Sequence, residues 1–144
     1  MLKKFLFSAV PVNLDRGVAI VRIMVGALLA YHGQEVFNTP LMAEYMTWDT
    51  FAGPNARLLV YVGKSTELMA GLLLLFGLFT RLGALMTIVA LSYITFFVGN
   101  GRFWYEDQHP FMFVLFGLLF LFTGPGAWSI DGVIFKERKS GRLL

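Results

Sequence analysis

Four long apolar runs fill most of this 144-residue chain and limit its fold more than any other feature. They lie at about residues 15–37, 57–79, 82–98 and 108–123. Helices of about 17–25 apolar residues are long enough to cross a hydrocarbon core of about 30 Å. Hydrophobic residues make up 57% of the chain and charged residues 15%, and the mean hydropathy is +0.67, which is unlike a soluble domain. We therefore predict an all-α integral membrane four-helix bundle that forms a single domain over residues 1–144.

The apolar runs are not those of a membrane β-barrel. Strands of such a barrel alternate apolar and polar residues, whereas Leu68–Leu78 and Phe111–Phe122 are apolar on every side. We expect Asp107 to cap the first turn of the last helix and Gly124-Pro125-Gly126 to end it. The sequence after that stop has no room for a fifth span.

The basic residues predict the orientation of the helices. The opposite loops hold only Arg57 and Arg102 as cations, so the positive-inside rule places both termini in the cytoplasm. The net charge of +3 and the pI near 9.4 come from basic flanks that suit anionic lipid headgroups, so we expect the lipid bilayer as partner and no nucleic acid. The flanking basic residues on the terminal side are Lys3, Lys4, Arg16, Arg81, Lys136, Arg138, Lys139 and Arg142.

We expect two segments outside the spans to lie at the membrane surface. The N-terminal ten residues should be retained and lie along the inner surface as a short amphipathic segment. Residues 38–56 contain Tyr45, Trp48 and Phe51 beside acidic residues and Gly53-Pro54, which is typical of a broken helix at the outer membrane surface. For this segment a passive aromatic anchor is favoured over a functional lid.

The chain contains no cysteine, so an internal dithiol relay, thiolate metal sites and covalently attached c-type haem are excluded. It also contains no HExxH motif and no Gly-rich phosphate loop, and we expect no metal. Redox chemistry would therefore require a bound cofactor or a partner protein.

Ionisable side chains inside the apolar runs are the candidate functional residues. A charge in hydrocarbon costs roughly 2.5–3.5 kcal/mol on insertion scales, so Arg22, Lys64 and Glu67 should face a partner or a polar cavity. A rise of ~1.5 Å per residue places Glu67 about 15 Å and Arg22 about 20 Å from the outer ends of their helices. We predict an Arg22–Glu67 pair, either as a structural staple or as part of a site; a local Lys64–Glu67 pair is the alternative.

The same depth comparison brings polar groups from all four helices into the outer half of the membrane. His32 and Glu35 lie near the outer end of the first helix, Tyr93 is similarly shallow on the third, and His109 opens the fourth. We assign catalytic roles to Glu67 and His32, and ligand-binding roles to Arg22, Lys64, Tyr93 and His109.

Simpler explanations exist for several of these residues. Lys64 can extend its ammonium group to the outer surface, and His32 can hydrogen-bond a neighbouring helix. His109 can be an ordinary interfacial residue. A haem held by both histidines is a further alternative, although histidines at helix ends need no ligand to explain them.

Several motifs in this order resemble the DoxX family of small four-helix bacterial membrane proteins. The first two are Arg22-Ile-Met-Val-Gly26 and Tyr31-His32-Gly33; the others are the stretch from Glu67 to Thr80-Arg81 and the stretch from Gly124 to Asp131. Within these motifs Arg22, His32, Glu67 and Arg81 match recurrent family positions. The resemblance covers residues 15–131 and implies a multi-pass protein of the bacterial inner membrane.

The best-known members of that family are associated with membrane redox chemistry, including a subunit like that of thiosulfate:quinone oxidoreductase. The resemblance therefore implies a quinone-interacting subunit of a membrane oxidoreductase, with a quinone as cofactor, a redox partner subunit and a possible homo-oligomer. The alternatives are a non-catalytic scaffold or assembly subunit and a small-solute carrier. Four helices without an internal repeat are few for alternating access, so the scaffold ranks above the carrier.

Overall fold

The computed structural model describes residues 7–135, and within them every regular element is a helix and none is a strand. The prediction of an all-α fold is confirmed. The predicted amphipathic start of the chain and the basic C-terminal end lie largely outside the described residues. The long helices are α2 (Leu14–Gly33), α4 (Ala56–Phe76), α5 (Thr80–Tyr93) and α6 (Gln108–Thr123); the short ones are α3 (Thr39–Tyr45), α7 (Ile130–Ile134), the 3₁₀ turns η1 (Gln34–Phe37) and η2 (Asp49–Phe51), and the π-helical turn η3 (Ile94–Val98).

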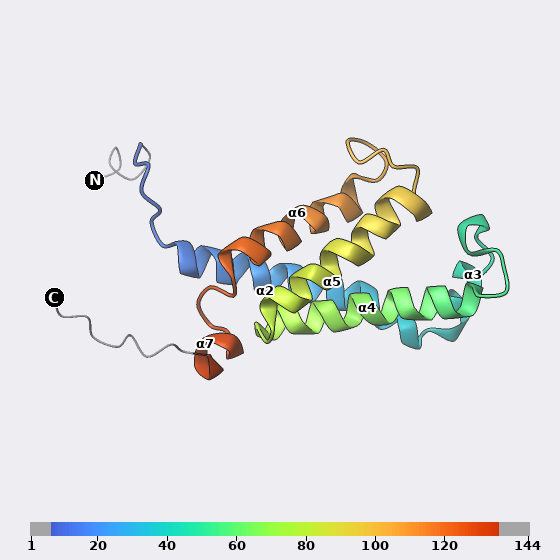
Figure 1. The fold of residues 1–144 in the computed structure, drawn as a ribbon, viewed down its shortest axis with the longest axis horizontal. Coiled ribbons are helices and arrows are strands. Elements are labelled where there is room, and N and C mark those ends of the chain that lie inside the picture. The colour runs from blue at the N-terminus through green and yellow to red at the C-terminus, as the bar shows by residue number, and fades with distance from the viewer. Residues whose placement is uncertain (1–6, 136–144) are drawn as a thin grey trace.

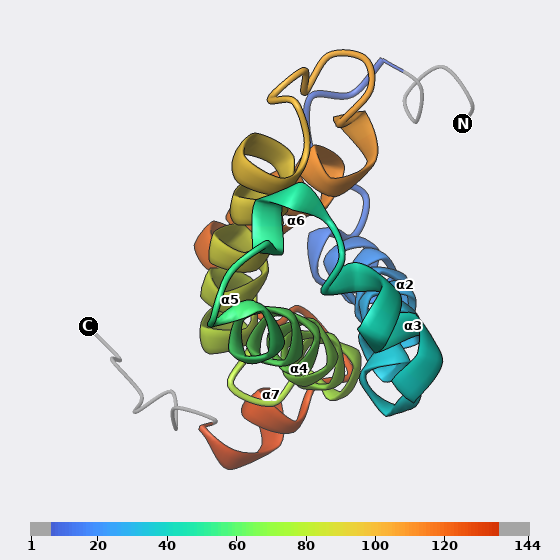
Figure 2. The same ribbon diagram turned by 90° about the vertical axis from the view of Figure 1, so that its right-hand side faces the viewer.

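The four long helices lie lengthwise beside one another, with α3 at one end of the bundle and α7 at the other (Figure 1). Helix α4 packs against both α2 and α5, and α5 packs against α6. The segment that contains α3 and η2 lies across the end of the bundle that faces the viewer in Figure 2. We call this the outer end, and the end with α7 the inner end.

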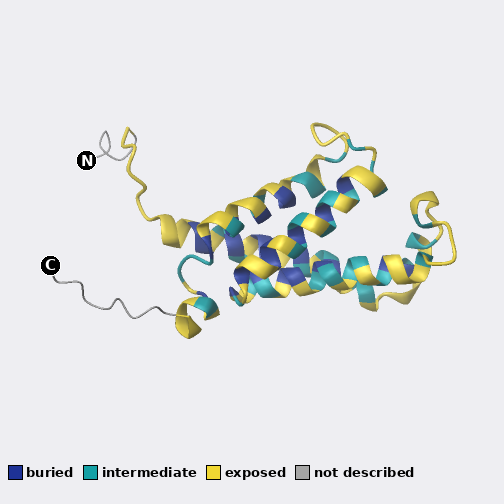
Figure 3. Ribbon diagram, viewed as in Figure 1, coloured by how far each residue is buried: buried dark blue, intermediate teal, exposed yellow. Residues whose placement is uncertain are grey.

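Two of the described helices are long and apolar enough to cross a membrane: Ala56–Phe76, and Thr80–Val98 when η3 is included with α5. The other two long helices do not meet the same criteria of length and composition. Helix α6 is apolar but has 16 residues, and α2 carries the charged residues Asp15, Arg16 and Arg22. Buried residues face the interior of the bundle, and much of its outer surface consists of exposed apolar side chains (Figure 3).

Glycines allow α2 and α4 to approach closely. A Cβ atom on Gly26 would collide with the backbone of Leu75, and one on Gly71 would collide with the backbone of Ala30. Small residues at helix contacts permit this distance between backbones, as is common in membrane proteins. These contacts fix an antiparallel register in which Gly26 lies beside Leu75.

Two of the predicted helix ends follow local sequence signals, and one predicted cap does not form. Helix α4 ends at Gly77, whose left-handed backbone (φ 61°) lets its N–H reach the carbonyls of Leu73 and Leu74. Helix α6 ends at Gly124 as expected. The prediction that Asp107 caps α6 with its side chain is wrong: its carboxylate instead accepts hydrogen bonds from the backbone N–H groups of Asn100 and Arg102, both at 2.9 Å. Asp107 therefore organises the loop between η3 and α6.

Candidate functional site

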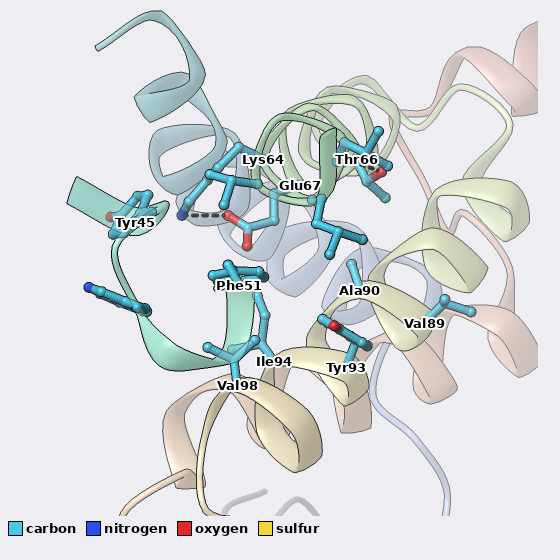
Figure 4. Close-up of a pocket in the computed structure, with 15 residues that line it drawn as sticks. Tyr45, Phe51, Lys64, Thr66, Glu67, Val89, Ala90, Tyr93, Ile94 and Val98 are labelled. Atoms are coloured by element: carbon cyan, nitrogen blue, oxygen red, sulfur yellow. Dashed lines mark hydrogen bonds and ion pairs between the residues drawn. The ribbon is translucent and has the colours of Figure 1, made fainter. Parts of the chain in front are cut away.

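A cavity of about 410 Å³ lies between α4 and α5 near the outer end of the bundle (Figure 4). Its walls are mainly apolar side chains, and its polar groups are concentrated on α4. The π-helical turn η3 contributes part of the wall, and such turns occur often at functional sites. The lining residues are Tyr45, Trp48, Phe51, Leu59, Val60, Val62, Gly63, Lys64, Thr66, Glu67, Val89, Ala90, Tyr93, Ile94 and Val98.

Lys64 is the centre of the polar part of the cavity. Its Nζ lies 2.8 Å from Oε2 of Glu35 and 3.0 Å from Oε2 of Glu67. Figure 4 shows one oxygen of Glu67 directed at Lys64 and the other turned toward Phe51. Glu67 is 3% exposed, so its charge depends on this single neighbouring ammonium group. The local Lys64–Glu67 pair that the spacing allowed is therefore present, and Lys64 points inward to Glu67 rather than outward to the surface.

Tyr45 and Trp48 connect the α3–η2 segment to this network. The hydroxyl of Tyr45 donates a 2.8 Å hydrogen bond to Oε2 of Glu35, and its ring lies 5.2 Å from Nζ of Lys64. Trp48 packs edge-on against Tyr45, with ring centroids 4.9 Å apart. Together with Phe51, these aromatic side chains cover the cavity. The segment therefore lines the cavity in addition to carrying the aromatic residues expected of an interfacial anchor.

The environment of Tyr45 changes its acidity. The pKa of Tyr45 is raised to about 12, first because burial disfavours the charged phenolate and second because the Glu35 carboxylate accepts the hydrogen bond of the neutral hydroxyl. Tyr45 is therefore a neutral hydrogen-bond donor at physiological pH.

The side walls of the cavity reach the outer faces of α4 and α5. Val62 on α4 is 55% exposed and Val89 on α5 is 69% exposed, although both line the cavity. Tyr93 also lines it and stacks on Phe97, with ring centroids 5.3 Å apart. The cavity consequently opens sideways between the two helices, through an apolar slot.

The two histidines lie beside each other, next to this network. The rings of His32 on α2 and His109 on α6 meet edge to face, with centroids 5.6 Å apart. Gly33, the residue after His32, lies against the backbone of Leu68, the residue after Glu67, so His32 is on the part of α2 that packs beside this network. Neither histidine lines the cavity. The structure therefore brings two pairs of predicted site residues to the outer end, Lys64 with Glu67 and His32 with His109, and it places Tyr93 on the opposite wall of the cavity.

The predicted Arg22–Glu67 pair is wrong. Arg22 is completely buried (0% exposed) at the inner end of the bundle and donates hydrogen bonds only to backbone carbonyls. Its guanidinium group joins the end of α4 to the chain after α6, so it is a structural residue and not part of the cavity. The acceptors are the carbonyls of Leu74, Leu75 at 3.2 Å, Pro125 at 2.8 Å, Ala127 at 3.3 Å and Trp128 at 2.9 Å.

The helix register explains this error. The prediction treated the outer ends of the first two helices as level, whereas Gly33 near the end of α2 lies beside Leu68, deep in α4. In the observed register Arg22 and Glu67 are separated by about twelve residues along the helices, or about 18 Å. An arginine side chain cannot cover that distance.

Asp131 completes the inner end. Its two carboxylate oxygens accept hydrogen bonds from the backbone N–H groups of Phe79 at 2.6 Å and Thr80 at 2.8 Å, at the start of α5. These donors lack partners within the helix, so the C-terminal segment caps α5. The Gly124–Asp131 motif is thus explained by its contacts with Arg22 and with the α4–α5 turn.

The comparisons with known proteins agree with the membrane character of the fold. The DoxX family profile matches residues 17–100 of the chain. An uncharacterised protein of Haemophilus influenzae is 30% identical over 128 residues, which cover 83% of this chain and 92% of the relative. A Bacillus subtilis protein named "Putative oxidoreductase CatD" is 25% identical over 91% of this chain and 96% of the relative.

A third relative, named "Uncharacterized membrane protein Rv3486" in Mycobacterium tuberculosis, is 28% identical over 83% of this chain and 82% of its own length. No solved structure matches the chain. The family profile covers more than half of the residues, including most of α2, all of α4 and α5, and the α3–η2 segment that lines the cavity. The chain is therefore a member of the DoxX family of membrane proteins.

Proposed function

We propose that this protein is a quinone-interacting subunit of a membrane oxidoreductase system. The observation that carries the proposal is the cavity of about 410 Å³ between α4 and α5, with apolar walls and with Lys64 and Glu67 as its polar end. Ligand pockets are commonly apolar cavities of about 300–1,000 Å³ with a few convergent polar groups. A quinone has the matching chemistry: a flat ring with carbonyl oxygens, and an apolar tail.

In this proposal the protein spans the bacterial inner membrane through α2, α4, α5 with η3, and α6, and both termini are cytoplasmic. The distribution of basic residues supports the orientation. The slot beside Val62 and Val89 then faces the lipid, so an isoprenoid tail can remain in the bilayer while the ring enters the cavity.

Each polar residue of the cavity has a role in binding such a ring. Lys64 donates a hydrogen bond to a quinone oxygen and stabilises negative charge that develops on it during reduction. Glu67, which is buried next to that position, exchanges a proton with the oxygen. Tyr93 on the opposite wall contacts the face of the ring. The bound quinone supplies the redox chemistry, and a partner subunit supplies or accepts the electrons.

Quinone retention tests the proposal. The protein is purified in mild detergent from a quinone-containing membrane and extracted with organic solvent, and the quinone is quantified per protein. The wild type should carry a near-stoichiometric amount, and Glu67→Gln and Lys64→Met should each lower it at least fivefold. Glu106→Gln is the matched control, because Glu106 pairs with Arg102 in an exposed loop away from the cavity and should retain the wild-type amount.

A wild-type extract without quinone would overturn the proposal, and so would equal retention by Glu67→Gln and the control. In that case a scaffold function is the better account. The burial of Arg22 against five carbonyls is the observation that supports this second candidate, because the cluster joins α2 and α4 to the segment after α6.

A further inference from the structure

The polar network at the outer end has an uneven charge count. Two carboxylates, Glu35 and Glu67, share the single ammonium group of Lys64. With both carboxylates ionised, the three residues together carry one uncompensated negative charge. Uncompensated charge is costly where it is largely removed from water, so this group favours binding one additional proton.

Glu67, His32 and His109 become progressively more exposed from the interior of the bundle to its surface. Glu67 is buried, His32 is partly exposed and His109 is exposed. His32 precedes Gly33, which lies against the backbone of Leu68 next to Glu67, and the His32 ring meets that of His109 at a centroid distance of 5.6 Å. The three residues come from α4, α2 and α6, so no single helix accounts for their alignment. An imidazole has two ring nitrogens and titrates near neutral pH, which suits it to pass a proton.

We propose that His32 and His109 form a proton relay that connects Glu67 with the aqueous medium at the outer end. The Glu67 carboxyl group gives its proton to the free ring nitrogen of His32, and the other ring nitrogen of His32 releases a proton to His109. His109 then gives a proton to water, and the reverse sequence reloads Glu67. Only protons move in these steps, and no electron is transferred.

The titratable and charged groups around His32 could also exchange a proton with it. The titratable or charged groups near it are Tyr31 on its own helix, Glu35 on η1, Glu67 with Lys64 on α4, and His109 on α6. Among the described residues no direct hydrogen bond joins His32 to Glu67 or to His109, so the proposed relay requires a bridging water at each of these two steps. The inference rests on the proposed role of Glu67 as a proton-exchanging group.

The relay is tested by infrared spectroscopy of the protein in liposomes after a rapid drop in external pH, without added quinone. The carboxyl band that is absent in Glu67→Gln identifies the protonation of Glu67. His32→Phe and His109→Phe retain an aromatic ring but cannot carry a proton, so each should slow protonation about tenfold or more. Tyr31→Phe keeps the other ring neighbour of His32 and should leave the rate unchanged.

Chemical rescue separates proton transfer from a structural effect. In His109→Ala, imidazole in the outer medium should restore most of the lost rate, because His109 is exposed. Wild-type rates in both phenylalanine variants, or failure of imidazole to restore the rate in a folded His109→Ala protein, would overturn the relay. Folding is checked by an unchanged thermal transition.

The relay and the quinone proposal can fail separately. A wild-type protein that retains no quinone but shows the histidine-dependent rate contradicts only the proposed function. A protein that retains quinone but protonates Glu67 at the wild-type rate without either histidine contradicts only the relay.

Discussion

Lys64 Nζ lies 3.0 Å from Glu67 Oε2, one turn away on α4, and this pair forms the polar end of an otherwise apolar cavity. A buried carboxylate beside one ammonium group is stabilised only while that partner is present. The same two side chains therefore affect both the stability of the protein and the polarity of the cavity. Removing one of them should change the free energy of unfolding differently from removing both.

Removing Lys64 alone should destabilise the protein more than removing the pair. Lys64→Met leaves Glu67 buried without a cation and should cost about 3 kcal/mol or more, as for other broken buried ion pairs. The double variant Lys64→Met/Glu67→Gln removes the unpaired charge and should recover part of that loss. Unfolding in mixed detergent measures both; equal or larger destabilisation of the double variant would contradict the assigned pair.

The cover of the cavity should respond to alkaline pH. Since burial and the hydrogen bond to Glu35 raise the pKa of Tyr45 to about 12, its neutral form is preferred in the folded state. The stabilisation that this provides is complete below pH 10, the ordinary tyrosine pKa, and is lost as pH rises through about 12. Ultraviolet titration should therefore show one tyrosine with a midpoint near 12, and this signal should disappear in Tyr45→Phe. A Tyr45→Phe difference signal with its midpoint at pH 10 would contradict both the burial of Tyr45 and its hydrogen bond to Glu35.

Arg22 should act as a structural residue that is independent of Glu67. Arg22→Met leaves several buried carbonyl groups without their donor, at about 1–3 kcal/mol for each group that stays unsatisfied, so it should be strongly destabilising. Its effect should add to that of Glu67→Gln within about 0.5 kcal/mol, because the two side chains are far apart and share no partner. A large coupling energy in this double-mutant cycle would restore the Arg22–Glu67 pair and contradict the observed register.

The glycine contacts between α2 and α4 should be sensitive to one added methyl group. Gly26→Ala places Cβ against the backbone of Leu75, which cannot move as a side chain can, and should cost about 1–3 kcal/mol. Gly17→Ala is the matched control on the same helix, because a Cβ there meets nothing within 4 Å. The control should be neutral or slightly stabilising, since alanine favours helix over glycine. Equal melting temperatures for the two variants would contradict the close packing of α2 and α4.

The sequence was sufficient for the helical fold because the apolar runs are long and end at strong signals such as Gly77 and Gly124. It also indicated that His32, Lys64, Glu67 and His109 lie at the same end of the bundle, since the end to which a residue is nearer follows from the order and direction of the runs even where the exact register does not. These four residues are at the same end of the bundle in the structure.

The position of Arg22 could not be predicted in this way. Its partners are set by the register of α2 against α4, which depends on backbone contacts at Gly26 and Gly71, and by a C-terminal segment that folds back onto the inner end. Every residue has a backbone carbonyl, so the sequence does not show which carbonyls accept hydrogen bonds from Arg22. The involvement of Tyr45 was missed for a related reason: a Tyr in an interfacial segment looks the same whether it anchors the protein to the membrane or donates to Glu35.

The most direct test of the central claim is mapping a photoreactive quinone on the purified protein in lipid nanodiscs. A ring-substituted azidoquinone is activated by light, and the labelled peptides are identified by mass spectrometry with excess unmodified quinone as competitor. The account predicts competed labelling of residues 59–67 of α4 and residues 89–98 of α5 and η3, which form the two walls of the cavity. Labelling confined to other segments, or labelling that excess quinone does not reduce, would contradict it.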